Sequence, residues 1–209
     1  MVTVAFLSAA STVAGLLRSP ALAASWTSPS ALAEFRVSGL AGHLARGVFT
    51  VERYLAAPVP SGGPNADAPS YFVAVSGDPD LSSETNRQIR DRGELDAGAG
   101  PDDLAGRYDA ALARLAAELP GIPPDRPVPM VAGHVLSLPD CLLTRLVELL
   151  VHADDLALSI GVAPPAFADE PADLVVSVLA RAARRRHGTA PVLRALARRE
   201  RAPGSISAF

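Results

Sequence analysis

The fold of this 209-residue chain is decided by one strongly apolar segment that carries a narrow row of polar side chains. Residues 142–156 read Leu142-Leu143-Thr144-Arg145-Leu146-Val147-Glu148-Leu149-Leu150-Val151-His152-Ala153-Asp154-Asp155-Leu156. In a helix, side chains four residues apart lie on the same face, so Glu148 and His152 are neighbours and Asp155 follows one turn later. Leucine, valine and alanine occupy most of the remaining circumference. The segment is therefore predicted to be a largely buried helix with one polar stripe.

The surroundings of this polar stripe bear on the direction in which it points. An ordinary surface helix packs one apolar face on the core and exposes the rest to water, whereas this helix is apolar on three sides. Such a stripe favours an orientation toward an internal cleft, where charged groups need a metal ion or ion-pair partners. The alternative is that the stripe is the one solvated face of a mostly buried helix. The polar residues within about 60° of Glu148 are Cys141, Thr144, Arg145, His152, Asp155 and Ser159.

The composition is that of a globular protein, with 49% hydrophobic and 20% charged residues and a net charge of -3. Over the whole chain, this charge creates no positive field that would attract nucleic acid or an acidic membrane surface. The single cysteine, Cys141, excludes an intramolecular disulfide and a cysteine-based zinc site, which agrees with a reducing compartment. We therefore expect a cytoplasmic protein that binds neither nucleic acid nor membranes.

The first residues raise the question of a secretion signal, because residues 4–17 are apolar and Ala21-Leu22-Ala23 resembles a signal-peptidase site. No basic residue precedes the apolar run, and serines and a threonine interrupt it. We therefore interpret it as a first amphipathic helix that ends before Pro20. No other stretch of the sequence approaches the length of uninterrupted apolar residues that a membrane span requires.

A second helix is predicted over residues 37–55, where apolar side chains recur with the helical period and stop before Pro58. Residues 58–101 are rich in glycine, proline, serine and aspartate, and within them residues 71–75 are expected to form a strand or a packed loop. Further helices are predicted over residues 86–94, 102–119, 140–160, 171–187 and 189–199, and a small hairpin over residues 128–138.

Four of these helices are long enough to enclose a core, and no linker clearly divides the chain. The sequence therefore predicts an all-α fold, namely an antiparallel four-helix bundle with long connections, a small β-hairpin and a short helical C-terminal extension. We assign residues 1–165 to the bundle and residues 166–209 to an extension that packs on it.

A metal site in such a bundle is built from facing helices, so a partner for Glu148 and His152 should come from another helix. His43 is the natural candidate, because it lies beside the apolar face of the second helix, and Gly47 one turn later is expected to leave open space. Taken alone, His43 is better explained as a hydrogen-bonded core histidine. The ligand interpretation becomes the better one only when His43 is considered together with the polar stripe of residues 142–156. The histidines that would replace it in a different packing are His134 in the hairpin and His187 at a helix end.

Two histidines and one glutamate leave a coordination position open, as catalytic zinc sites do. Iron, nickel and manganese accept the same ligands to differing degrees. The spacing Glu-x3-His differs from the Glu-x2-His of di-iron bundles and has no second copy, so we expect a mononuclear site. Cys141 lies about 10 Å from Glu148 along the helix axis, too far to share the metal, and is expected to be a small buried side chain.

Two stretches resemble signatures of the mycothiol-dependent maleylpyruvate isomerase family, within the DinB-like four-helix metalloprotein superfamily. The first is Trp26-Thr27-Ser28-Pro29-Ser30 followed by residues 37–45, and the second, more specific one runs from Thr144 to Ala157. The resemblance extends over residues 4–160. It departs from the family at residues 31–36, where a phenylalanine stands in place of the Gly-Trp of many relatives.

The resemblance implies roles for individual residues. The family's metal ligands correspond to His43, Glu148 and His152, and the aspartate that binds its thiol cofactor corresponds to Asp155. An arginine near the carboxyl end should hold the same cofactor, and we assign this role to Arg199. The spacing does not choose among the arginines of this segment, which are Arg198, Arg199 and Arg201.

The implied cofactors are a divalent metal ion, most simply zinc, and mycothiol. A metal ion can bind a thiol as thiolate at neutral pH, and a thiolate can add to an activated double bond and leave after rotation, or displace a leaving group. The implied function is therefore a mycothiol-dependent isomerase or thiol S-transferase that acts on a small electrophilic substrate, as a monomer or homodimer. Arg145, one turn before Glu148, is expected to support a carboxylate of the site.

Other functions remain as alternatives. A non-catalytic metal-binding or interaction protein would keep the same ligands without turnover. A nucleic-acid interface at residues 181–187 is disfavoured, because positive charge there suits a helix C-terminus and no aromatic side chains are interleaved. The arginines of residues 86–92 are expected to lie on a solvated helix, with a rim that binds an anionic substrate as the alternative.

Overall fold

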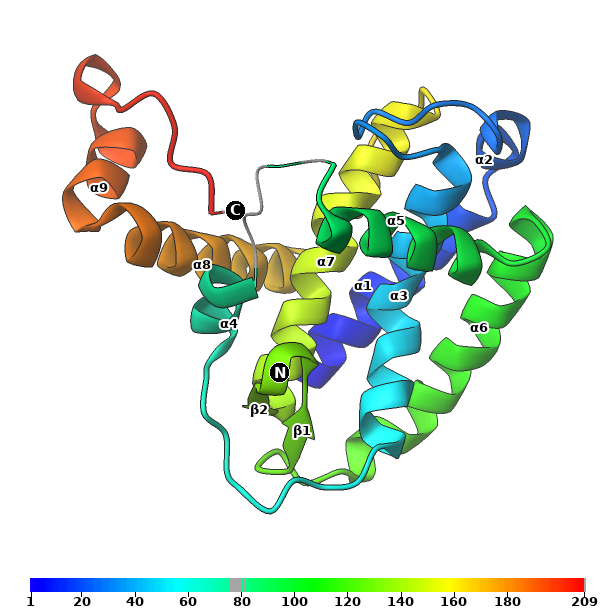
Figure 1. The fold of residues 1–209 in the computed structure, drawn as a ribbon, viewed down its shortest axis with the longest axis horizontal. Helices are drawn as coiled ribbons and strands as arrows, with labels where there is room; N and C mark the ends of the chain where they lie inside the picture. The colour runs from blue at the N-terminus through cyan, green and yellow to red at the C-terminus, as the bar shows by residue number, and fades with distance from the viewer. Residues whose placement is uncertain (76–79, 81, 209) are drawn as a thin grey trace.

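The computed structural model describes residues 1–75, 80 and 82–208, and these residues are mostly helical (Figure 1). The helices are α1 (Val2–Leu17), α2 (Pro20–Ser25), α3 (Val37–Ala56), α4 (Ala68–Val75), α5 (Glu84–Ala97), α6 (Pro101–Glu118), α7 (Leu138–Ser159), α8 (Asp169–His187) and α9 (Thr189–Ala197). Three short 3-10 turns are η1 (Leu119–Gly121), η2 (Val131–Gly133) and η3 (Arg199–Arg201). The strands β1 (Pro127–Pro129) and β2 (Val135–Ser137) pair antiparallel, with Val128 opposite Leu136, as the predicted hairpin requires.

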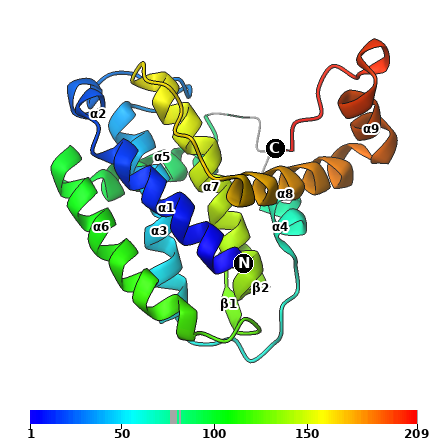
Figure 2. The same cartoon turned by 180° about the vertical axis from the view of Figure 1, so that it is seen from behind.

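Four helices, α1, α3, α6 and α7, enclose the main hydrophobic core, because α1 and α3 each pack against both α6 and α7 (Figures 1 and 2). The apolar period of α3 that the sequence shows is buried in this core. The all-α bundle with a small hairpin is therefore confirmed. Fully buried core side chains from the four helices include Phe6, Leu17, Leu40, Leu44, Leu104, Tyr108, Leu115, Leu142 and Leu149.

Helix α5 attaches to α3 by direct contact of the two backbones. A Cβ atom added to Gly42 would overlap the carbonyl oxygen of Gly93, and one added to Gly93 would overlap that of Gly39. Within α5, only Gly93 and Ala97 are buried, so this polar helix has few apolar side chains that could hold it in place. The predicted helix over residues 86–94 is confirmed, and glycine explains how so polar a helix can dock.

Residues 71–75 are helical, which corrects the expectation of a strand or loop. They form the end of α4, whose start is held by two carboxylates. Asp67 accepts a hydrogen bond from the backbone N–H of Ser70 (2.9 Å), and Asp140 of α7 accepts one from the backbone N–H of Ala68 (3.0 Å). These bonds satisfy N–H groups that lack a partner in the first turn of any helix. Capping therefore outweighs the strand preference of the aromatic and β-branched side chains.

Gly47 does not leave open space, contrary to expectation. A Cβ atom at this position would lie 2.7 Å from a methyl carbon of Leu149, so the absence of a side chain is what lets α7 approach α3 closely. This approach matters for function, because it brings the polar stripe of α7 up to the side of α3 that carries His43.

The segment after the bundle forms a projecting arm, which we define as residues 174–208. Helix α8 first packs against α4 and α7, where Val147 of α7 and Val175 of α8 belong to one buried cluster. It then runs away from the bundle, and α9 lies at its far end (Figures 1 and 2). Arg185 joins this arm to the bundle through two hydrogen bonds to Asp67, of 2.9 and 2.8 Å. The boundary at residue 165 stays a prediction.

None of the helices in the described part of the chain combines the length and the apolar character that crossing a membrane requires.

Candidate metal centre

The structure brings three residues of the predicted site together between α3 and α7. His43 extends from α3, and Glu148 and His152 extend from adjacent turns of α7. Glu148 Oε2 lies 3.6 Å from His43 Nε2 and 3.3 Å from His152 Nε2. One ligand atom from each residue lies within 4.8 Å of the other two, so the three residues are close enough to hold a single metal ion after small side-chain adjustments. The polar stripe therefore faces a neighbouring helix rather than bulk water.

The other histidines of the chain lie elsewhere. The ring of His134, in the hairpin region, packs against Tyr71 at a centroid distance of 5.5 Å. His187 Nε2 lies 2.7 Å from the carbonyl oxygen of Ser207, in the C-terminal arm. Among the described residues, only His43 joins the Glu148 and His152 pair in a group with metal-ligand geometry.

Asp155 fixes the orientation of one of the candidate ligands. Its Oδ2 atom lies 2.9 Å from His152 Nδ1, so the imidazole presents Nε2 to the group. Metal-bound histidines usually have such a carboxylate partner on the second ring nitrogen. The sequence analysis missed this contact, although the three-residue spacing of His152 and Asp155 is the signal that would have indicated it.

A chain of hydrogen bonds continues from Asp155 to the loop before α3. Ser159 donates its hydroxyl to the carbonyl oxygen of Asp155 (2.6 Å) and accepts a hydrogen bond from the backbone N–H of Ala31 (2.9 Å). The loop that carries the first family signature is thereby attached to the last turns of α7. Both segments of the resemblance thus meet beside the group of His43, Glu148 and His152.

The group is shielded but reachable. The side chains of His43, His152 and Glu148 are 16%, 19% and 23% exposed, so solvent reaches part of each of them. The ring of Phe35 lies 5.9 Å from that of His43 and covers part of it. His43 Nδ1 is buried without a hydrogen-bond partner among the described residues. The Nε2 atoms of both histidines are therefore the ones available for coordination.

The charges of the group differ from those of isolated side chains. Burial opposes the ionisation of Glu148, but hydrogen bonds from His152 and His43 outweigh it and hold the pKa of the carboxyl well below its usual range. Burial also disfavours the charged form of His152, yet the carboxylates of Asp155 and Glu148 raise its pKa to about 9. Burial lowers the pKa of His43. Glu148 is therefore anionic at neutral pH, and His43 is neutral.

Two further members of the polar stripe, Arg145 and Cys141, are buried in the bundle. Arg145 is buried, donates its Nε–H to the hydroxyl of Thr144 (3.1 Å) and contributes to the low pKa of Glu148 through its charge. Cys141 is fully buried, and burial raises the pKa of its thiol to about 12. Arg145 therefore acts on the carboxylate as predicted, whereas Cys141 is an inert core side chain.

Arg199, the predicted thiol-cofactor contact, is not part of this group. It lies in η3, which directly follows α9 at the end of α8 remote from α3 and α7 (Figures 1 and 2). Its role, like that of Asp155 toward a thiol cofactor, stays a prediction.

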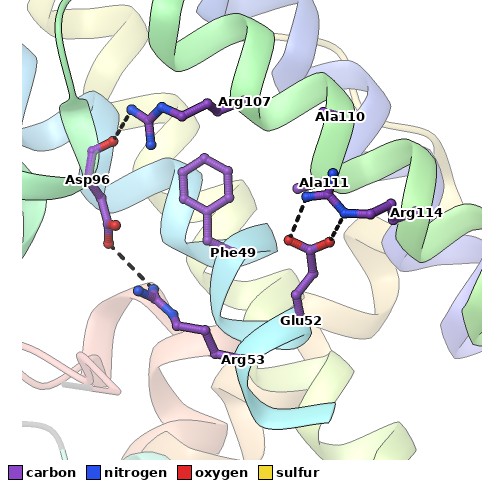
Figure 3. Close-up of a pocket in the computed structure, with 8 residues that line it drawn as sticks. All are labelled: Phe49, Glu52, Arg53, Asp96, Arg107, Ala110, Ala111 and Arg114. Atoms are coloured by element: carbon purple, nitrogen blue, oxygen red, sulfur yellow. Dashed lines mark hydrogen bonds and ion pairs between the residues drawn. The ribbon is translucent and has the colours of Figure 1, made fainter. Parts of the chain in front are cut away.

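Away from this group, a hollow of about 320 Å³ lies between α3, α5 and α6 (Figure 3). Arg114 donates two hydrogen bonds to Glu52, of 2.7 and 3.2 Å, and the guanidinium of Arg107 lies 5.5 Å from the ring centre of Phe49. Arg107 and Arg114, which line this hollow, thus interact with side chains of the protein itself. The residues that line the hollow are Phe49, Glu52, Arg53, Asp96, Arg107, Ala110, Ala111 and Arg114.

Comparison with known proteins gives one match. The family model of the mycothiol maleylpyruvate isomerase N-terminal domain matches residues 6–157, a segment that includes His43, Glu148 and His152. No curated protein and no solved structure matches the chain significantly. The match covers well over half of the chain and ends in α7, so α8 and α9 lie beyond it. This chain belongs to the mycothiol maleylpyruvate isomerase N-terminal domain family.

Proposed function

We propose that this chain is a mycothiol-dependent metalloenzyme, an isomerase or thiol S-transferase that acts on a small electrophilic substrate. The observation that carries the proposal is the convergence of His43, Glu148 and His152 from two helices that the family match also contains. A set of two imidazoles and one carboxylate is typical of catalytic zinc, because it leaves a position for a further ligand.

The donor set fits a divalent metal ion, with zinc as the first choice. Both histidines offer Nε2, Glu148 is held in its ionised form, and His152 has the carboxylate partner that ligating histidines usually have. A divalent metal at this position supplies positive charge that lowers the pKa of a coordinating thiol, so that the thiolate forms at neutral pH.

The remaining roles belong to the chain's own residues. Asp155 Oδ2 orients His152, which leaves the other carboxylate oxygen to accept a hydrogen bond from the thiol cofactor. Phe35 limits access of water beside His43, while the partial exposure of the three side chains gives a small molecule access to the group. Arg199 is proposed as a second contact for the cofactor, and this role requires the segment after α8 to move toward α7, since η3 lies away from it here.

The metal site is tested by the metal content of the purified protein. We expect about one metal ion per chain in the unaltered protein, and an affinity at least a hundredfold lower in His152→Ala and His43→Ala, because each removes one of three ligands. His134→Ala, which removes a histidine outside the group, is the matched control and should retain the metal. Full metal content in His152→Ala would contradict the assignment.

The reaction class is tested by turnover. The metal-loaded protein should convert small electrophiles with an activated double bond or a displaceable group in the presence of mycothiol, and more slowly with other low-molecular-weight thiols. His152→Ala should reduce this rate to that of the thiol alone. Stoichiometric metal binding without any thiol-dependent turnover would refute the enzyme proposal and favour a non-catalytic metal-binding protein.

A further inference from the structure

The net charge of -3 conceals two regions of opposite charge. The C-terminal arm, residues 174–208, contains eight arginines and one glutamate, whereas residues 1–173 contain eleven arginines and 21 acidic residues. With histidines neutral, the arm carries +7 and the rest of the chain -10. Because α8 and α9 extend away from the bundle, the two charges are also separated in space (Figures 1 and 2). The arm is thus a basic projection from an acidic body.

Helix α9, at the end of the arm, combines this charge with exposed apolar side chains. Leu193 and Leu196 are 60% and 69% exposed, and their three-residue spacing places them on the same side of the helix. The neighbouring Arg194 is exposed and forms no ion pair with any described residue. Helix α9 therefore presents a surface that is both apolar and basic.

Helix α7 presents the complementary chemistry. Val147, Val151, Asp154 and Leu158 lie on one face of it, because their spacing of four, three and four residues follows the helical repeat. Val147 is buried in the cluster that α8 shares, but further along the same face Asp154 is exposed and Leu158 is 71% exposed. Among the described residues, no element covers this upper part of the face, which is apolar and acidic.

An apolar groove connects the arm to this face. It has a volume of about 310 Å³ and lies between α7, α8, α9 and the last residues of the arm. Val151 lines it from α7, Val176 and Leu179 from α8, and Leu196 from α9. The α7 face therefore continues into the groove, and together they form one extended surface with an acidic end on α7 and a basic end on α9.

The occupant that matches both ends of this surface is a second copy of this chain. The leucines and arginine of α9 complement the leucine and aspartate of α7 in polarity and in charge, and one molecule carries both. In a two-fold pair, the same contact therefore forms twice. An anionic lipid surface would attract the arm but leave Leu158 uncovered beside a repelled carboxylate. Nucleic acid would bind the arginines without covering any leucine.

We propose that this chain forms a two-fold dimer in which α9 of each copy packs on the upper face of α7 of the other. Leu193 and Leu196 contact Leu158 of the other copy, and Arg194 lies beside its Asp154. The expectation that the chain does not bind acidic surfaces was based on the net charge of the whole chain. The arm alone is strongly basic, so it can bind an acidic surface such as the α7 face of a second copy.

The apolar part of the contact is tested by sedimentation equilibrium of the full chain. We expect a dimer at micromolar concentration and a dissociation constant about a hundredfold higher in the double variant Leu193→Ser, Leu196→Ser, because burial of four leucines is lost per dimer. Leu95→Ser is the matched control, since Leu95 is 79% exposed on α5 and should leave the constant unchanged. Circular dichroism verifies that each variant keeps its helices.

The contact between Arg194 and Asp154 of the other copy is tested by exchanging the charges of the two residues. Arg194→Glu and Asp154→Arg should each weaken the dimer about tenfold, and the double variant should recover most of the loss because it restores an opposite pair. Raising the salt concentration should weaken the unaltered dimer for the same reason.

Three results would overturn the proposal. They are a monomer at every concentration, a dimer that the leucine variant leaves intact, and charge exchange without recovery. Co-sedimentation with anionic and with zwitterionic vesicles tests the rival partner directly. Binding of a monomer to anionic vesicles that the leucine variant abolishes would assign α9 to a lipid surface instead.

Discussion

His43 and His152 belong to the same group, yet their surroundings move their pKa values in opposite directions. Burial keeps His43 neutral, whereas the carboxylates of Asp155 and Glu148 keep His152 protonated up to about pH 9 when no metal is bound. A metal ion coordinates only the neutral imidazole, so it must displace the proton of His152 but none from His43. Metal binding and proton release are therefore coupled through one residue.

This coupling predicts the pH dependence of metal binding. At pH 7, zinc binding should release about one proton, and the apparent affinity should rise about tenfold per pH unit until it levels off near pH 9. Titration calorimetry in buffers of different ionisation enthalpy measures the proton count. Absence of proton release at pH 7 would show that His152 is already neutral in the metal-free protein.

The raised pKa of His152 also makes the stability of the metal-free fold depend on pH. Because the pKa of His152 is raised above its unfolded value of about 6.5, its contribution to stability is complete below that pH. The contribution is lost as the pH rises through about 9.

At the residue scale, the sequence was sufficient to bring His43, Glu148 and His152 together as one candidate group, but not to indicate the contacts that support them. Helical spacing alone places Glu148 beside His152, and the apolar face of α3 indicates His43 as the partner. The contact of Asp155 with His152 depends on side-chain rotamers, and the filling of the space beside Gly47 depends on how closely α7 approaches. Neither the rotamers nor the interhelical distance is encoded in residue spacing.

At the element scale, the docking of α5 depends on the absence of side chains on both helices. Gly42→Val would introduce a branched side chain where the carbonyl of Gly93 already lies, so the helices must separate. We expect a loss of about 2 kcal/mol or more in the free energy of unfolding, measured by urea denaturation.

Gly106→Ala is the control for this prediction. Gly106 lies within α6, and a Cβ atom there would meet no atom within 4 Å. The substitution should stabilise the protein by about 0.5 to 1 kcal/mol, because alanine favours the helix and restricts the unfolded chain. Equal stability of the Gly42→Val variant and the unaltered protein would contradict a backbone contact between α3 and α5.

The long helices could be predicted from the periodic spacing of their apolar residues. Helix α4 could not be predicted in this way. Its start depends on Asp140, which is 72 residues further along the chain and caps Ala68 only after α7 has packed. Long-range capping of this kind leaves no periodic signal in the local sequence. The aromatic run at residues 71–75 was therefore interpreted from strand preference alone.

At the scale of the whole molecule, Asp67 joins two helices, because it caps α4 and accepts hydrogen bonds from Arg185 of α8. Burial opposes its ionisation, but hydrogen bonds from Arg185 and Ser70 outweigh it and hold the pKa of the carboxyl well below its usual range. Asp67→Asn should lower the free energy of unfolding at pH 7 by about 1 kcal/mol, since a paired charge and a strong cap acceptor are lost.

The pH dependence of this difference identifies its cause. A depressed pKa contributes stability above the unfolded value of about 3.9, and this contribution disappears as the pH falls through the folded value. The gap between the unaltered protein and Asp67→Asn should therefore narrow below about pH 4 in urea denaturation experiments. A gap that is constant down to pH 2 would point to a cause other than the carboxylate charge.

The bundle could be predicted as a whole, but the course of the arm could not. Amphipathic periods show which helices share a core, and the family resemblance ends before α8 begins. The direction of α8 depends on pairs such as Asp67 with Arg185, which are 118 residues apart. Surface ion pairs of this kind follow from the packed structure and have no counterpart in composition.

The burial of Cys141 has a practical consequence for a protein proposed to handle reactive electrophiles. Its only sulfhydryl group is enclosed in the core and stays protonated far above neutral pH, so a substrate in solution meets no competing nucleophile of this type on the protein. The cysteine is thereby protected against alkylation by electrophiles. Consumption of an electrophile by a thiol therefore reports on the added thiol, and the reaction of that thiol without protein is the background to subtract.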